Sequence, residues 1–266
     1  MTTTTADLAG AAGGTTHTWE PPSGIAPRGT LLVFPGRGEH SGVYERFGLR
    51  LAADGYVVHA LGSTPGLDAT SALALATALA GPEPAVPVVL VGSDTGALQA
   101  LQTAATADPG LPVEGVILAG TAPTAAAPGP PQEAEGGPEP QDDWQWELAA
   151  RTACPTHRRR LTDDAAFVRG QLTTDVPAHL LDAARPALPA LLLHGEADPV
   201  TPLEEIRELA AQLPRATLAV LHDGLHDVLN DAAHRTIAAA VVQWLERLRT
   251  DRSMSPLLTV ESEPGR

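Results

Sequence analysis

The segment at residues 88–97 carries a carboxylate at a position suited to covalent chemistry. It reads Val-Val-Leu-Val-Gly-Ser-Asp-Thr-Gly-Ala, which predicts a buried strand, a tight turn and the start of a helix. Gly92 and Gly96 lie two positions on either side of Asp94, the G-x-Nu-x-G spacing of a nucleophile elbow. Ser93 lies one position too early for this spacing. An ordinary turn with Asp94 as a capping residue is the alternative that this segment alone leaves open.

An aspartate at this position predicts a particular reaction. The unpaired N–H groups and the dipole of a helix N-terminus stabilise a carboxylate, so Asp94 should be ionised at neutral pH and need no base to activate it. A carboxylate attacks saturated carbon to give an alkyl ester, whereas attack on an ester carbonyl would give a high-energy mixed anhydride. The elbow therefore favours cleavage of a C–O or C–halogen bond at saturated carbon.

Two later loops supply partners for Asp94. Asp198 follows an apolar strand expected at 188–194, and His226 lies in the loop after a strand expected at 216–221. Functional groups gather at the carboxyl ends of strands in open α/β sheets. The order Asp94, Asp198, His226 is nucleophile, acid and base, the chain order of the α/β-hydrolase triad. His222 is a competing base, but it should lie closer to the sheet.

Alternating strands and helices predict the framework that positions these residues. Apolar runs indicate strands at 29–34, 56–61, 87–92, 113–119, 188–194 and 216–221, with helices at 43–54, 69–80, 96–107, 203–213 and 232–249. This alternation is typical of an α/β fold with a mostly parallel central sheet flanked by helices. The predicted core covers residues 16–120 and 188–249, with a disordered N-terminus at 1–15 and a flexible tail at 250–266.

One segment, at residues 121–187, interrupts the alternation. Its first part, 121–140, is rich in proline and predicts a linker, and helical patterns without a convincing strand follow. Trp144, Trp146 and Phe167 give the segment apolar surface to bury. We therefore expect an inserted helical cap, with a disordered insertion as the alternative.

Composition narrows the class of protein. The chain has 266 residues and a net charge of −15, which disfavours nucleic acids and anionic membranes as partners. No apolar run is long enough to span a membrane, and no signal peptide is evident. Cys154 is the only cysteine, which favours a cytoplasmic protein without an intrachain disulfide. A small-molecule substrate is expected, with no metal and no cofactor; the sequence leaves the oligomeric state open.

Three loops resemble the monoacylglycerol lipase and lysophospholipase branch of the α/β-hydrolase superfamily. Residues 35–44, Pro-Gly-Arg-Gly-Glu-His-Ser-Gly-Val-Tyr, are similar to its H-G-x-G-E-H-S-G-x-Y loop. Residues 194–200 resemble its H-G-x-x-D-x-[IV] acid loop, and residues 226–230 resemble its H-x-x-x-N histidine loop. The resemblance implies the α/β-hydrolase fold and an oxyanion hole formed by the backbone N–H groups of Arg37 and Thr95.

The chain departs from this branch at three places. Pro35 replaces a histidine, the D-x-R-G-H-G segment is absent from residues 61–66, and Asp94 replaces serine. Aspartate nucleophiles are instead familiar from haloalkane dehalogenases and epoxide hydrolases. In such a site Trp144, Trp146 or His157 could bind a leaving group or substrate from the cap, although the tryptophans also suit packing.

Three functional hypotheses follow. The leading one is a hydrolase in which Asp94 forms a covalent alkyl ester and His226, oriented by Asp198, activates water. The second is a lysophospholipase-like or monoacylglycerol lipase-like carboxylic ester hydrolase that uses Ser93 or water activated by His226. The third is a non-hydrolytic lyase or cyclase, or a ligand-binding pseudoenzyme.

Overall fold

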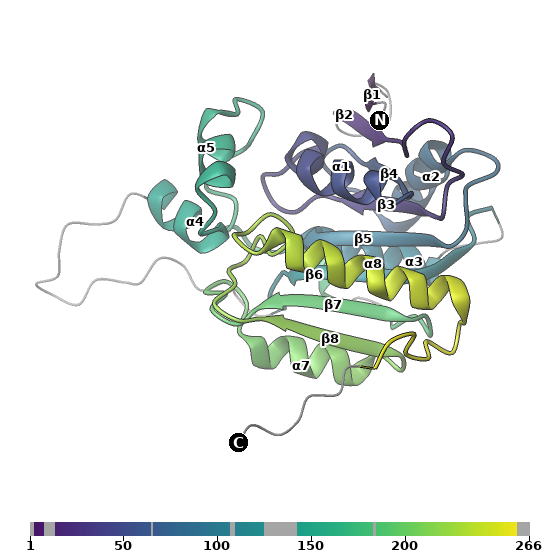
Figure 1. Ribbon diagram of the computed structural model, residues 1–266. Coiled ribbons are helices and arrows are strands. Elements are labelled where there is room, and N and C mark those ends of the chain that lie inside the picture. The colour runs from purple at the N-terminus through teal and green to yellow at the C-terminus, as the bar shows by residue number, and fades with distance from the viewer. Residues whose placement is uncertain are drawn as a thin grey trace, which may run out of the picture.

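The computed structural model places an eight-stranded sheet at the centre of the protein (Figure 1). It describes residues 3–7, 14–64, 66–106, 110–124, 143–182 and 185–259. The strand order is β1-β2-β4-β3-β5-β6-β7-β8. The strands are β1 (Thr3–Asp7), β2 (Thr15–Trp19), β3 (Thr30–Phe34), β4 (Val57–Ala60), β5 (Val88–Asp94), β6 (Val113–Thr121), β7 (Ala190–Gly195) and β8 (Ala216–Leu221).

The sheet is parallel except at one edge. β1 pairs antiparallel with β2, and β2 pairs antiparallel with β4, while all the other neighbours run parallel. Every residue of β3, β5 and β7 is buried, which explains their continuous apolar sequences. The predicted α/β fold with a mostly parallel sheet is confirmed.

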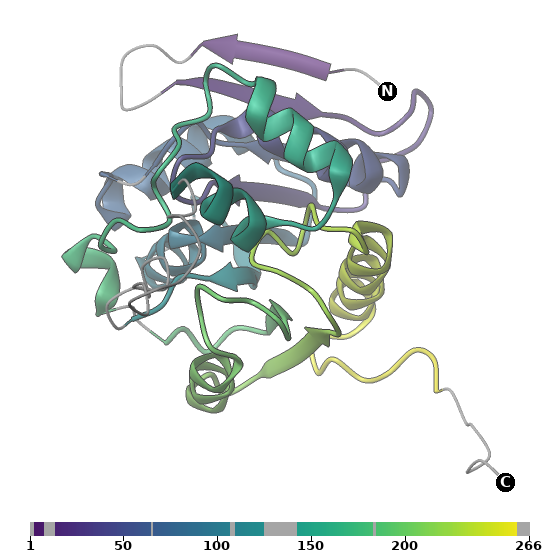
Figure 2. The ribbon, with the colours of Figure 1, turned by 90° about the vertical axis from the view of Figure 1, so that its left-hand side faces the viewer.

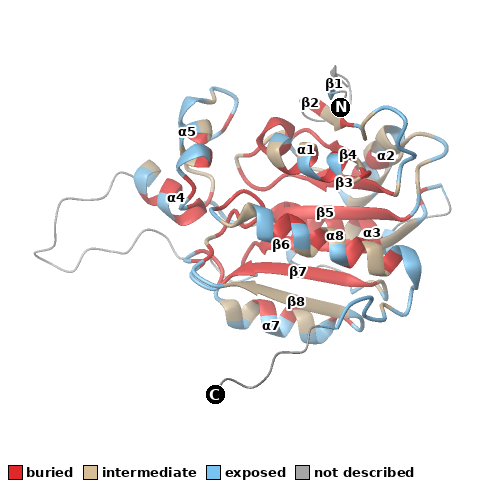
Figure 3. Ribbon diagram, viewed as in Figure 1, coloured by how far each residue is buried: buried red, intermediate tan, exposed pale blue. Residues whose placement is uncertain are grey.

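Helices cover both faces of the sheet and form two cores. α1 (Glu45–Ala53), which follows a short 3₁₀ turn at Ser41–Tyr44, and α8 (His234–Thr250) pack on one face. α2 (Ala69–Ala80), α3 (Thr95–Thr106) and α7 (Leu203–Gln212) pack on the other. Figure 3 shows buried residues throughout the central strands and exposed ones on the outer sides of the helices. No helix within the described residues is long and apolar enough to cross a membrane.

Three further helices lie between β6 and β7 in the sequence: α4 (Asp143–Arg151), α5 (Pro155–Asp163) and α6 (Ala178–Leu181). α4 and α5 lie beyond one end of the sheet in Figure 1 and face the viewer in Figure 2. Backbone hydrogen bonds join α4 to the loop after β8, from the N–H of His226 to the Ala150 carbonyl (3.2 Å) and from the N–H of Asp227 to the Arg151 carbonyl (2.8 Å). The inserted segment is thereby attached where the parallel strands end.

The terminal segments differ in part from the expected disorder. Residues 1–15 were expected to be disordered, but Thr3–Asp7 form β1 and pair in register with β2, from Thr3 opposite Trp19 to Asp7 opposite Thr15. Threonine is β-branched and suits an edge strand, so pairing supplies the order that local sequence alone did not predict. Parts of the expected disorder and linker lie outside the described residues, at 1–2, 8–13, 125–142 and 260–266, whereas Thr121 ends β6 and residues 250–259 of the expected flexible tail are described, with Thr250 as the last residue of α8.

The turn after β5 has the strained geometry that an elbow requires. Asp94 has a φ of +51°, in the left-handed region that non-glycine residues rarely adopt. A Cβ on Gly92 would lie 2.1 Å from the Gly96 carbonyl oxygen, and a Cβ on Gly96 would lie 2.1 Å from the Phe34 carbonyl oxygen. Both glycines are therefore required by the close approach of β5, α3 and β3, which disfavours an ordinary turn.

We predict that Gly96→Ala destabilises the protein severely, because its methyl group would meet the immobile backbone of β3. A loss of about 3 kcal/mol or more in unfolding free energy is expected, which lowers Tm by roughly 6–12 °C. Gly66→Ala is the matched control, since nothing lies within 4 Å of its added Cβ. Thermal unfolding followed by circular dichroism measures both, and equal Tm values for the two variants would contradict the tight elbow.

Candidate active site

Asp94, His226 and Asp198 form one hydrogen-bonded line at the carboxyl ends of the strands. His226 Nε2 lies 3.3 Å from Asp94 Oδ1, and His226 Nδ1 lies 2.8 Å from Asp198 Oδ2. Asp94 is the last residue of β5, while His226 and Asp198 follow β8 and β7, and parallel strands bring their carboxyl ends to the same edge. All three side chains are buried.

The loop after β7 fixes the orientation of Asp198. Its second oxygen, Oδ1, accepts hydrogen bonds from the N–H groups of Val200 (2.8 Å) and Thr201 (3.3 Å). Oδ2 is thereby left for His226. Thr201 is held in turn by a hydrogen bond from its hydroxyl to the Thr121 carbonyl (2.8 Å). The acid is therefore positioned by backbone groups of two neighbouring strand ends.

Arg37 occupies the remaining side of the Asp94 carboxylate. Its backbone N–H and its Nε both donate to Asp94 Oδ2 at 2.8 Å, and its Nη2 donates to Oδ1 at 2.8 Å. Together with His226, these groups fill the roughly four lone-pair directions of the carboxylate. Asp94 is 1% exposed and Arg37 is 3% exposed, so this is a buried, bidentate ion pair.

The expected oxyanion-hole donor therefore contacts the protein's own carboxylate. The Arg37 N–H, predicted to bind a substrate oxygen, donates to Asp94. Thr95, the second predicted donor, begins α3 directly after Asp94 and is buried. The aspartate side chain thus lies where a reacting oxygen would be stabilised.

Electrostatics fix the charge states of this line. Burial alone would raise the pKa of Asp94, but the Arg37 charge and the hydrogen bonds from His226 and Arg37 outweigh it and hold the pKa well below its usual range. Burial alone would lower the pKa of His226, but the charge and hydrogen bond of Asp198, with those of Asp94, raise it to about 10. At neutral pH His226 is therefore an imidazolium between two carboxylates.

Arg37 also ties the inserted segment to the elbow. Its Nη1 donates to the carbonyl oxygens of Leu172 (3.1 Å) and Thr174 (2.6 Å), which lie between α5 and α6. Because the same guanidinium binds Asp94, any movement of Arg37 must break contacts on both sides. The Arg37 side chain therefore links access to Asp94 with the position of residues 172–174.

A second buried cation, Arg151 at the end of α4, supports the Arg37 loop from behind. Its guanidinium contacts Glu147 (2.9 Å) and Asp227 (3.2 Å), lies 3.9 Å from Glu39, and donates to the Arg37 carbonyl oxygen (2.7 Å). These carboxylates raise the pKa of Arg151 although burial opposes them. Arg151 thereby holds the inserted helix, the loop after β3 and the loop after β8 together.

The predicted substrate-contacting residues of the insertion have partners of their own. The Trp144 ring lies 5.8 Å from the Phe167 ring and under the Arg169 guanidinium, at 4.6 Å. Trp146 is buried in a small apolar cluster with Ala150, Leu172 and Val200. His157 is buried, and its Nε2 lies 3.1 Å from Asp227 Oδ2. These contacts place all three residues in the packing of the insertion and its ionic support.

The two competing residues lie elsewhere. Ser93 is within β5, 5% exposed, and its hydroxyl faces the phenol of Tyr44 on the α1–α8 side of the sheet. His222 is exposed at the surface, with its Nδ1 2.9 Å from Glu196. His226, not His222, therefore pairs with Asp198.

Sequence reasoning missed the Arg37 and Arg151 side chains. It assigned only the backbone of Arg37 a role and gave Arg151 none. The sequence did contain one signal for Arg37: a carboxylate that replaces serine at a buried elbow needs a cationic partner. Arg37 occupies the variable position of the loop that approaches that elbow.

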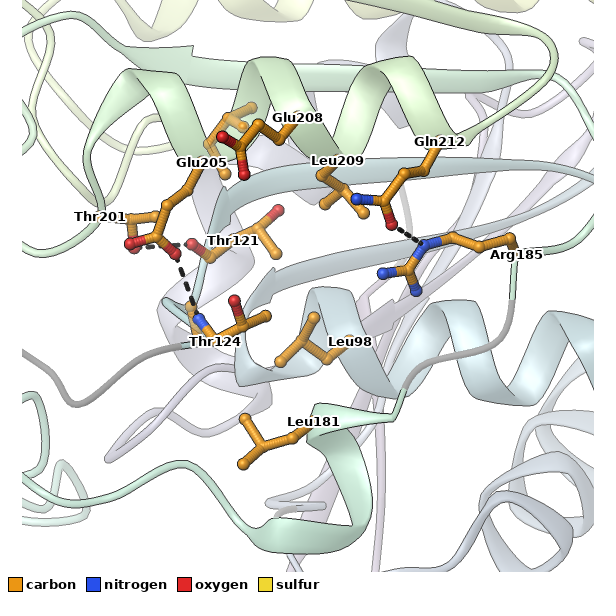
Figure 4. A pocket seen from close by; sticks show the side chains of 12 residues that line it. Leu98, Thr121, Thr124, Leu181, Arg185, Thr201, Glu205, Glu208, Leu209 and Gln212 are labelled. Atoms are coloured by element: carbon orange, nitrogen blue, oxygen red, sulfur yellow. Dashed lines mark hydrogen bonds between the residues drawn. The ribbon is translucent and has the colours of Figure 1, made fainter.

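A small pocket borders the acid loop at Thr201 (Figure 4). Its volume of about 70 Å³ is enough for a few water molecules. Glu205 accepts a hydrogen bond from the Thr124 N–H (3.3 Å), and Arg185 Nε donates to Gln212 (3.0 Å) across its mouth. Asp94 and His226 do not line it, so it is separate from the line of reactive groups.

Comparison with known proteins identifies a family and a fold. The family model for serine aminopeptidase S33 matches residues 68–233. A monoacylglycerol lipase from Paleococcus ferrophilus is 21% identical with a TM-score of 0.64, covering 90% of this chain and 98% of the other. A carboxyl esterase from Bacillus coagulans is 17% identical with a TM-score of 0.69, covering 94% and 99%. No curated protein matches the sequence.

We predict that protonated His226 makes stability fall as pH rises. The pKa of about 10 in the folded protein lies above the ordinary value of 6.5, so this stabilisation is complete below pH 6.5 and is lost as pH rises through about 10. The slope should reach about 1.4 kcal/mol per pH unit and be absent in His226→Gln.

Urea unfolding at pH 7, 8 and 9 measures this slope. Other groups that titrate in this range are common to both proteins and cancel in the difference. His222→Gln is the control, because His222 is exposed and should leave the slope nearly unchanged. Parallel pH dependences for the wild type and His226→Gln would show that His226 is not a stabilised imidazolium.

Proposed function

The chain belongs to the serine aminopeptidase S33 family, and we propose that it hydrolyses small carboxylic esters with water as the attacking group. The observation that carries this proposal is the Asp94–His226–Asp198 line, which ends in a carboxylate at the strained elbow. The lipase and esterase folds among its structural relatives support the ester class. The Ser93 hydroxyl faces the phenol of Tyr44, whereas His226 Nε2 lies beside Asp94, which disfavours a serine mechanism.

The chemistry of a carboxylate favours water over direct attack on an ester. Attack by Asp94 on a carbonyl carbon would give a mixed anhydride, whereas the same carboxylate can accept a proton from water. In the described arrangement it is a weak base, because Arg37 holds its pKa well below the usual range. Activation therefore requires that Arg37 move away from Asp94.

We infer that the substrate itself provides this change. An ester carbonyl oxygen that takes the Arg37 guanidinium becomes polarised by it. Asp94 then loses the Arg37 charge, the largest of the influences that lower its pKa, while His226 remains beside it and burial continues to raise the pKa. One movement of Arg37 thus makes the carbonyl carbon more electrophilic and Asp94 more basic.

The reaction then proceeds as a single displacement. The water oxygen bonds to the carbonyl carbon while a water proton passes to Asp94 Oδ1, and Arg37 stabilises the oxyanion. The tetrahedral intermediate collapses with loss of the alcohol oxygen, which is protonated directly from Asp94 or from His226 Nε2; in the second case the proton held by Asp94 Oδ1 passes to the imidazole and restores both groups. Asp198 holds the imidazolium in place throughout. The products are one carboxylic acid and one alcohol.

The inserted helices are proposed to act as a cap over this site. Arg37 binds the carbonyl oxygens of residues 172 and 174, so its movement towards a substrate would release that segment. The partner is a small molecule, and the single cysteine supports a cytoplasmic location.

A second candidate is the covalent reaction at saturated carbon. Two observations favour it: the Arg37 N–H holds Asp94 Oδ2, and Oδ1 points towards His226. This arrangement would suit a carboxylate that attacks through one oxygen while the other is stabilised. The substrate would then be an epoxide or alkyl halide, and water activated near His226 would release the alkyl ester.

Variants of the reactive line test the ester proposal. With a p-nitrophenyl ester, Asp94→Asn and His226→Gln should each lower kcat by about 10²-fold or more, because proton transfer is lost. Ser93→Ala should keep most of the activity. Loss of turnover in Ser93→Ala with survival in Asp94→Asn would assign the nucleophile to Ser93, and no turnover by the wild type would refute ester hydrolysis.

Single turnover in heavy-oxygen water separates the two candidate reactions. Direct attack by water places the label in the acid product and leaves the Asp94 peptide unlabelled. A covalent aspartyl ester resolved at its carbonyl would place the label in the Asp94 carboxylate. Mass spectrometry of product and peptides measures both, and Asp94→Asn is the control for background exchange. Label in the Asp94 peptide would overturn the single displacement.

A further inference from the structure

A pocket of about 520 Å³ lies between α1 and α8, which pack on the same face of the sheet (Figure 1). Three apolar side chains line it, Phe47, Leu229 and Ala238, and each is 3% exposed, so they form its floor. Its remaining lining is basic. The α1–α8 pocket is lined by Arg46, Phe47, Arg50, Leu229, His234, Arg235 and Ala238.

The positive charge of this pocket is only partly neutralised. Arg50 pairs with Asp54 at 3.1 Å. Arg46 donates instead to neutral acceptors, the Cys154 sulfur (3.3 Å) and the Asn230 carbonyl oxygen. Arg235 forms no ion pair within the described ranges. Two guanidinium groups therefore line one pocket without a carboxylate partner, in a chain whose net charge is −15.

Asp231, a buried carboxylate in the loop before α8, already has hydrogen-bond donors of its own. Its Oδ1 accepts from the Thr152 hydroxyl (2.9 Å) and the Ala153 N–H (2.7 Å), and its Oδ2 accepts from the Leu225 N–H (3.0 Å). Asp231 thus stabilises the insertion and the histidine loop. It is not available to neutralise the arginines of the pocket.

The pKa of His234 is shifted by the same positive charges. Burial, followed by the positive charges of Arg46 and Arg235, lowers its pKa below the ordinary value. The pocket therefore already disfavours further positive charge. An entering anion would relieve this repulsion and would meet a low-dielectric floor that strengthens the attraction.

We propose that the α1–α8 pocket binds a phosphate monoester of a small organic molecule. Arginine guanidinium groups recognise phosphate oxygens by paired hydrogen bonds, and Arg46 and Arg235 would supply them. The apolar floor would take the organic part, and the volume lies in the range of small-molecule sites. This site is distinct from the Asp94 line and does not depend on the proposed ester hydrolysis.

The pocket borders the loop that carries His226. Leu229 lines it, and Arg46 holds the carbonyl oxygen of Asn230, three and four residues after that histidine. A bound phosphate should therefore protect this stretch of backbone from hydrogen exchange. This protection locates the ligand independently of any effect on activity.

The test titrates phenyl phosphate into the full-length protein by calorimetry at fixed ionic strength, with phenol and inorganic phosphate as comparison ligands. Phenyl phosphate should bind, phenol should not, and inorganic phosphate should bind more weakly. Arg235→Gln should weaken binding about tenfold through loss of a charge-assisted hydrogen bond. Arg207→Gln, an exposed arginine on α7 across the sheet, should bind like the wild type.

Arg46→Gln should also weaken binding, but it loses a structural hydrogen bond, so Arg235→Gln is the deciding variant. Amide exchange should slow at residues 46–50 and 229–238 when phenyl phosphate binds. The proposal is overturned if the wild type does not bind phenyl phosphate or if Arg235→Gln and Arg207→Gln bind equally. Equal binding of inorganic phosphate, or protection centred on Arg37, would also overturn it.

Discussion

The buried ion pair between Arg37 and Asp94 is the interaction on which the site depends. A carboxylate that is 1% exposed cannot stay ionised in a folded protein without compensating charge, and Arg37 supplies it by side chain and backbone together. Removing one partner of such a pair typically costs about 3–5 kcal/mol. The same contact sets the low pKa of Asp94, occupies the expected oxyanion donor and holds residues 172–174 over the elbow.

Charges alternate outward from this pair, so that each buried group has a neighbour of opposite sign. Asp198, protonated His226, Asp94 and Arg37 follow one another along the strand ends. Arg151 continues the pattern behind the Arg37 loop, with Glu147 and Asp227 as its closest carboxylates. Because these residues come from the core and from the insertion, the same ion pairs that set the electrostatics of the site also attach α4 to the core.

The exchange of serine for aspartate changes what the family framework can do. In a serine hydrolase a neutral histidine takes the proton of the nucleophile. Here a second carboxylate faces His226, and Asp198 together with Asp94 raises the pKa of His226 to about 10, so the imidazole is already protonated at neutral pH. In the proposed ester hydrolysis the role of base therefore falls to Asp94, whose pKa depends on Arg37. In the α1–α8 pocket, by contrast, Arg46 and Arg235 have no carboxylate partner within the described ranges.

The sequence by itself determined the α/β framework, the elbow at Asp94 and the placing of Asp198 and His226 at strand ends, since apolar runs, glycine spacing and strand order are local patterns along the chain. Only the tertiary structure decided that the Arg37 side chain closes on Asp94 across 57 positions of sequence, that Ser93 faces Tyr44, and that His157 binds Asp227. Residues 3–7 likewise form a strand only because β2 is there to pair with them. Side-chain partners and charge states arise from segments that are distant in sequence, and no local pattern records which of them folding brings together.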